Sequence, residues 1–132
     1  KSTTTTGQEN VTPVLSADDL FAYQNLVRNV PVADNVIEYA VDFVNSTRSV
    51  SNGHAGPAKN WLEWGAGPRA SMYLILAAKA KALLDSRTTP DISDVQQMLS
   101  PVLRHRIIPS FNAEADGISR DDILKIILES TS

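Results

Sequence analysis

Apolar side chains recur at intervals of three and four residues along much of the chain, which is the period of a helix with one buried face. The first such helix begins after Ser16, a favourable N-cap residue that Asp19 complements three positions later. It ends at Pro31, because the residue before a proline is disfavoured in the helical conformation. A second helix is predicted to start near Asp34. The apolar faces of the two helices comprise Leu20, Tyr23, Val27 and Val30, and then Val36, Ile37, Ala40, Val41 and Val44.

The second half of the chain contains the strongest predicted helix, from Pro68 to about Ser86, which is rich in Ala, Leu, Lys and Met. It is apolar on nearly every side, so we expect it at the centre of the core. Further helices are predicted after the caps Ser93 and Ser119, and residues 106–111 (RIIPSF) predict a short edge strand or an extended crossing. The predicted fold class is therefore all-α, a small helical bundle of about five helices with at most a vestigial β-hairpin.

Two polar stretches lie outside this pattern. Residues 1–13 are predicted to be a flexible linker, because residues 1–10 (KSTTTTGQEN) hold four consecutive threonines and no large apolar side chain whose burial could offset the entropy of ordering. Residues 14–132 then form the folded domain. Residues 46–57 (STRSVSNGHAGP) predict a polar, glycine-rich loop. Because the first residue is not a methionine, we also expect the chain to be a piece of a longer polypeptide.

Composition and charge narrow the class of protein. The 132 residues are 42% apolar, enough for one domain with a real core. The formal net charge of −3 argues against a non-specific nucleic-acid binder, and Arg104 and Arg106 make only a small basic spot. The absence of cysteine excludes disulfides and Cys-ligated zinc. No apolar run approaches the roughly 18 residues of a membrane span, so we expect a soluble cytoplasmic domain with neither a membrane nor a nucleic-acid partner.

No arrangement of side chains in the sequence predicts catalysis by this chain alone. His54 lies in the glycine-rich loop, and His105 lies near a helix end, where a histidine more often completes hydrogen bonds or the helix dipole than binds a metal. The pairs Asp18–Asp19 and Asp121–Asp122 fall in predicted first turns, where the dipole favours negative charge. No Gly–Lys pair of a phosphate-binding loop occurs. We therefore expect no metal site.

The segment from Gly65 to Ser71 (GAGPRAS) is the one candidate binding feature. It delivers Arg69 into the predicted first turn of the apolar helix, with Pro68 at the first helical position. The unpaired N–H groups of that turn and the guanidinium together predict an anion-binding corner that suits phosphate. The alternative is a surface arginine whose stem packs on Trp64.

Residues 61–71 (WLEWGAGPRAS) resemble the sensor-2 segment of MoxR-type AAA+ ATPases. The resemblance continues in order on both sides and covers Val14 to the C-terminus. The matching blocks are VRNVPVAD at 27–34, YAV at 39–41, AKAKAL at 78–83, PDI at 90–92, PVLRHR at 101–106 and EADGIS at 114–119.

This resemblance implies that the chain is the C-terminal helical lid of an AAA+ ATPase whose α/β nucleotide-binding domain lies outside it. In the family the lid closes over ATP, and the sensor-2 arginine, carried onto Arg69, contacts the γ-phosphate. Gly67 and Pro68 shape the start of that helix, and Pro31 and Val32 lie near the adenine. ATP and Mg²⁺ are then cofactors of the full-length parent, which hydrolyses ATP to ADP and phosphate. The chain alone is expected to bind neither and to have no turnover.

The same resemblance implies the partners of the parent. They are its own AAA+ core domain, the neighbouring subunits of a ring homo-oligomer (a hexamer), and proteins with a von Willebrand A-type domain. The family is expected to act in chaperone-like remodelling or maturation of client proteins. A different class of function is a freestanding helical protein-interaction module, which would expose a large apolar patch; Trp61 and Trp64 are either that patch or part of the core.

Overall fold

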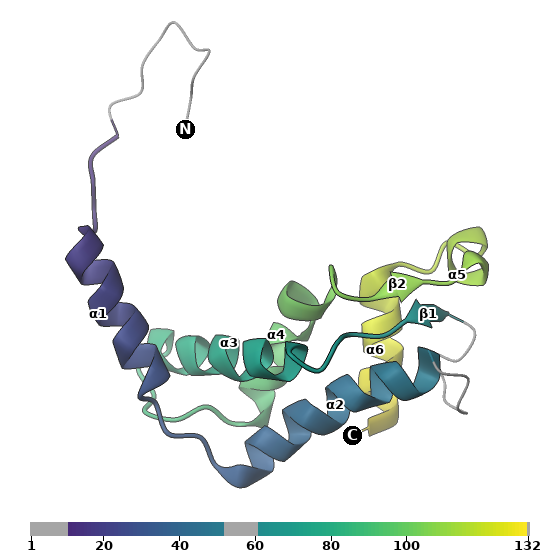
Figure 1. Cartoon of the computed structure of the whole chain (residues 1–132), viewed down its shortest axis with the longest axis horizontal. Helices are drawn as coiled ribbons and strands as arrows, with labels where there is room; N and C mark the ends of the chain where they lie inside the picture. The colour runs from purple at the N-terminus through teal and green to yellow at the C-terminus, as the bar shows by residue number, and fades with distance from the viewer. Residues whose placement is uncertain (1–10, 52–60, 132) are drawn as a thin grey trace, which may run out of the picture.

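Six helices and two short strands make up the part of the chain that the structure describes, residues 11–51 and 61–131 (Figure 1). In this computed structural model the helices are α1 (Ala17–Arg28), α2 (Asp34–Ser51), α3 (Ala70–Leu84), α4 (Ile92–Leu103), α5 (Phe111–Ala115) and α6 (Arg120–Thr131). The strands are β1 (Leu62–Trp64) and β2 (Ile108–Pro109). The all-α prediction is confirmed, with one helix more than expected.

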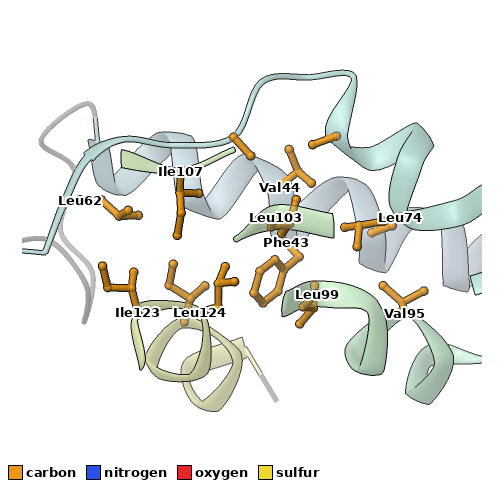
Figure 2. Packing of buried hydrophobic residues seen from close by; sticks show 14 of the residues in the cluster. Phe43, Val44, Leu62, Leu74, Val95, Leu99, Leu103, Ile107, Ile123 and Leu124 are labelled. Carbon is orange, nitrogen blue, oxygen red and sulfur yellow. The ribbon is translucent and has the colours of Figure 1, made fainter. Parts of the chain in front are cut away.

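The hydrophobic core lies between α2, α3, α4 and α6, whose apolar faces meet in one cluster. Figure 2 shows Phe43 of α2 between side chains of α4 and α6, including Leu99 and Leu124. Burying a phenylalanine side chain of this kind stabilises the fold by about 2–3 kcal/mol. The largest fully buried apolar side chains are Phe43, Val44, Leu74, Val95, Leu103, Ile107, Ile123 and Ile127.

Helix α3 contributes to the core, but only one of its sides is fully buried, which corrects the prediction that it is surrounded by the core. Its buried face is mostly alanine, with Ala78 and Ala82 fully covered, and these small side chains allow α4 to pack closely. Met72 and Leu84 on its other faces are 68% and 83% exposed. An apolar sequence on all sides of a helix therefore did not reveal which side the neighbouring helix covers.

Helix α1 extends away from the other helices, at the left of Figure 1, and packs against α3. The predicted cap is confirmed, because Ser16 and Asp19 form a reciprocal capping box. None of its twelve residues, all within the described part of the chain, is buried. Leu20 and Tyr23, predicted to lie on its inner face, are about half exposed.

The two strands form an antiparallel pair between segments far apart in the sequence, with Leu62 opposite Pro109. The prediction of at most a vestigial hairpin is confirmed by the small size of this pair, although its two strands are not consecutive along the chain. The extended segment within residues 106–111 is present as β2. The short helix α5 was not predicted; Ser110 caps it. Gly117 ends it with a φ of +70°, a conformation that glycine adopts without strain.

Two further boundaries differ from the predictions. Helix α4 is capped by Asp91 and Asp94, which form a capping box, and not by Ser93. Helix α2 continues through Ser51, so residues 46–51 of the predicted loop are helical. The rest of that loop, including His54, lies outside the described residues. The predicted cap of the last helix is confirmed, because Ser119 and Asp122 exchange hydrogen bonds across its first turn.

Candidate functional site

The segment that leads into α3 is held directly against the backbone of α2. A Cβ atom added to Gly65 would lie 2.7 Å from the amide nitrogen of Arg48, and closer still to the carbonyl of Thr47. Only glycine allows this approach without a shift of the backbone. At the next residue, the amide of Ala66 donates a hydrogen bond of 3.0 Å to Oγ1 of Thr47. The glycine at position 65 is thus explained by contact with α2.

Arg69 is the N-cap residue of α3, with φ −68° and ψ −18°, and its side chain is exposed. Its neighbours on both sides are anchored, since Ala66 is 0% and Ala70 is 2% exposed. Within residues 11–51 and 61–131, the guanidinium of Arg69 makes no hydrogen bond and no ion pair with another side chain. A fixed backbone therefore carries a charged group that faces solvent and is available to an anion.

The backbone amides of this turn contribute less to an anion site than the sequence predicted. The amide of Ala70 donates to the carbonyl of Gly67 at 3.0 Å, and the amides of Met72 and Tyr73 donate to the carbonyl of Arg69 at 3.1 and 3.3 Å. The turn before the helix is tight and satisfies these donors internally. The helix itself begins at Ala70, so Pro68 lies in the preceding turn and not at the first helical position. Of the groups predicted to form the anion-binding corner, the guanidinium of Arg69 is, unlike these three amides, left without an internal partner among the described residues.

A second guanidinium lies on the same face of α3. The Cζ atom of Arg106 lies 4.3 Å from the centre of the ring of Tyr73, a cation–π contact. Tyr73 follows Arg69 by four residues, so the two side chains occupy one side of the helix. The alternative prediction of Arg69 stacked on Trp64 finds no support among the described contacts, and Trp64 is 62% exposed.

Pro31 and Val32, predicted to lie near an adenine, are at the other end of α3 from Arg69. The hydroxyl of Thr89, in the turn after α3, donates a hydrogen bond of 2.8 Å to the carbonyl of Pro31. Val32 is half-buried and packs against the core. Since α3 has 15 residues, about 20 Å separates the two ends. The described part of this chain therefore does not bring Pro31 and Val32 into one cluster with Arg69.

The turn between α3 and α4 is fixed by a buried carboxylate that the sequence did not single out. Asp94 is completely buried, and its two oxygens accept hydrogen bonds of 2.5 and 2.7 Å from the guanidinium of Arg87. It also accepts from the amide of Asp91 at 2.9 Å. The hydrogen bonds from Arg87 lower the pKa of Asp94 to about 2, against the effect of burial. This pair ties the end of α3 to the start of α4.

The outer faces of α1 and α3 form an exposed apolar surface, hereafter the α1–α3 face. A groove of about 580 Å³ in it is lined by Leu15, Tyr23, Leu26, Val27, Ala80, Leu83 and Leu84. A second groove of about 290 Å³ lies farther along the same pair of helices. Trp61, by contrast, packs against the core. Large contiguous apolar patches are typical of surfaces that contact another protein, a membrane or a ligand.

In the two described ranges, no group of three or more histidine or acidic side chains is placed to hold a metal ion. None of the described helices combines the length and the apolar character that crossing a membrane needs. His105 is exposed at the end of α4.

Comparison with known proteins identifies the class. Residues 58–127, more than half of the chain, match the AAA lid domain family, and the chain belongs to that family. Over 119 residues it is 33% identical to "Chaperone MoxR1" of Mycobacterium tuberculosis, covering 90% of this chain and 32% of the relative. Over 122 residues it is 30% identical to "Uncharacterized protein YeaC" of Bacillus subtilis, covering 92% of this chain and 35% of the relative.

A solved structure shows the same fold. The crystal structure of "a putative ATPase" from Cytophaga hutchinsonii superimposes with a TM-score of 0.77 at 28% sequence identity, covering 85% of this chain and 34% of that one. Within the lid family, the chain is the lid domain of a MoxR-type AAA+ ATPase. It spans about a third of the length of the relatives it matches.

Proposed function

We propose that this lid closes over ATP held by the nucleotide-binding domain of its parent and that Arg69 contacts the γ-phosphate. The observation that carries the proposal is the state of Arg69: an exposed guanidinium, without a partner in the described ranges, on a backbone anchored at Ala66 and Ala70. A guanidinium offers a planar set of donors that suits phosphate oxygens. Gly67 and Pro68 form the turn that presents it.

The chemical role of Arg69 is electrostatic. Negative charge spreads over the oxygens of the phosphoryl group as it is transferred, and a guanidinium already in place stabilises that charge without reorganisation. We assign Mg²⁺ and the remaining phosphate contacts to the nucleotide-binding domain of the parent. Pro31 and Val32 are proposed to lie beside the adenine, at the far end of α3.

The α1–α3 face is proposed to pack against the parent's own nucleotide-binding domain. Leu84 is 83% exposed and Leu26 is 53% exposed in the lid alone, and covering such side chains stabilises a domain contact. Closure of the lid would then move this face as a rigid body. We further propose that the parent forms a ring homo-oligomer, a hexamer, that remodels client proteins, in company with von Willebrand A-type partners.

The test of the proposed role of Arg69 uses the full-length parent. Arg69→Ala is expected to lower kcat for ATP hydrolysis by about a hundredfold, the usual effect of removing one charge-stabilising donor. The affinity for ADP, which lacks the γ-phosphate, should stay unchanged. Lys125→Ala removes an exposed cation from α6 and is the matched control. Wild-type turnover by Arg69→Ala would refute the assignment.

The exposed α1–α3 face also fits the second class of function, a helical protein-interaction module. The two functions predict different effects of this face on ATP turnover by the parent. If it packs on the parent's nucleotide-binding domain, Leu84→Asp lowers ATP turnover by the parent, because an introduced charge at a covered apolar contact is unfavourable. If it serves only to bind a separate protein, turnover is independent of Leu84.

A further inference from the structure

Thr47 is the most completely enclosed polar group next to the loop that carries Arg69. Thr47 lies on α2, and its side chain is 0% exposed. Its hydrogen-bond partner, Ala66, follows 19 residues later in the sequence. The hydroxyl donates to the carbonyl of Val44 at 2.7 Å and accepts from the amide of Ala66 at 3.0 Å. The hydroxyl therefore uses its one donor and one of its two acceptor lone pairs inside the protein.

The bond to Ala66 fixes the backbone three residues before Arg69. Gly65 already lies in tight contact with the backbone of α2 at Thr47. Ala66 is fully buried, and the loop turns at Gly67 to enter α3. The position of Arg69 relative to α2 thus depends on a short, doubly anchored segment, because few rotatable bonds separate the Thr47 contact from Arg69.

We propose that Thr47 is a positioning residue for Arg69, and that its hydroxyl holds the arginine where the lid presents it to the γ-phosphate. This inference rests on the proposed role of Arg69. Thr47 touches no nucleotide; it acts through the backbone of residues 65–69. A positional error of about 1 Å in a charge-stabilising group can cost on the order of a hundredfold in rate.

Two variants separate the hydroxyl of Thr47 from the rest of its side chain, and a third serves as a control. Thr47→Val keeps the shape and removes the hydroxyl, which leaves the buried amide of Ala66 without a partner. Thr47→Ser keeps the hydroxyl and removes the methyl group. Ser46→Ala is the matched control, because Ser46 also bonds a carbonyl three residues back, that of Phe43 at 2.6 Å, without a hydrogen bond to the loop among the described contacts.

The first measurement is backbone order by ¹⁵N relaxation of the 132-residue chain. We expect Thr47→Val to lower the order parameters of Ala66, Gly67 and Arg69 from about 0.85 to below about 0.6. Thr47→Ser and Ser46→Ala should leave them unchanged. Unchanged order in Thr47→Val overturns the proposal, whatever the role of Arg69 in the parent proves to be.

The second measurement is ATP turnover by the full-length parent in a double-mutant cycle. In the parent that keeps Arg69, Thr47→Val is expected to lower kcat about tenfold. In the Arg69→Ala background, the same change should lower kcat less than twofold. Thr47→Ser should keep a kcat close to that of the wild type. Equal losses in both backgrounds would show a merely structural role and overturn the proposal. If Arg69→Ala alone keeps wild-type turnover, the proposed function fails, and the relaxation result still decides whether Thr47 positions the loop.

Discussion

The buried pair of Arg87 and Asp94 lends itself to a quantitative test of stability. Asp94→Asn keeps the shape of the side chain but removes its charge. It replaces one of the two oxygens that accept from Arg87 with a donor, so the guanidinium loses its bidentate partner. Arg87 is 37% exposed on its side chain and can regain part of its hydration. Asp94→Asn is therefore expected to lower the unfolding free energy by less than the breaking of a fully buried ion pair does.

The size of the effect follows from the pKa of Asp94. Folding lowers it from 3.8 to about 2, chiefly through the hydrogen bonds from Arg87. Each pKa unit corresponds to about 1.4 kcal/mol, so the charged form of Asp94 stabilises the fold by about 2 kcal/mol at neutral pH. For a domain of this size that corresponds to a decrease of roughly 8 °C in Tm.

Urea unfolding at pH 7 measures this difference directly. Because the pKa is lowered by folding, the stabilisation is complete above about pH 4 and is lost as the pH falls through about 2. The gap in unfolding free energy between wild type and Asp94→Asn should therefore narrow between pH 4 and pH 2. Asp42→Asn is the control, because Asp42 is exposed and has no ion-pair partner among the described residues.

Two results would contradict this reasoning. Equal unfolding free energies of wild type and Asp94→Asn at pH 7 would show that Arg87 gains nothing from the charge of Asp94. A gap that stays constant down to pH 2 would show that the loss in Asp94→Asn comes from packing and not from the ionised carboxylate.

Two further predictions concern packing. Gly65→Ala should lower the unfolding free energy by about 2 kcal/mol, because its Cβ would press on the backbone of α2. Gly67→Ala is the control and should change the unfolding free energy by less than about 0.5 kcal/mol, because an added Cβ there meets no described atom within 4 Å. Similar Tm values for the two variants would contradict this. Phe43→Ala should lower the unfolding free energy by about 3–5 kcal/mol through the cavity it leaves. Phe111→Ala, at an 81% exposed position, should change it by less than about 0.5 kcal/mol. Comparable urea midpoints for the two variants would refute the assignment of Phe43 to the core.

Local interactions were predicted from the sequence, because they depend on residues a few positions apart. The capping boxes at Ser16 and Ser119 involve partners three residues away, and both are present. The cap of α4 was misplaced because Ser93 and Asp91 are both good caps. Asp91 is the cap because the buried carboxylate of Asp94 accepts hydrogen bonds from the amide of Asp91 and from the guanidinium of Arg87.

The sequence by itself determined that the chain is helical, where most helices begin, and that Arg69 stands at the start of α3. Only the tertiary structure decided which side of α3 is buried, that β1 pairs with β2 across the chain, and that Thr47 holds Ala66. The physical reason is distance along the sequence. Periodicity and capping report on contacts within a turn or two, whereas packing partners and buried hydrogen bonds join segments whose meeting depends on how all the helices pack together.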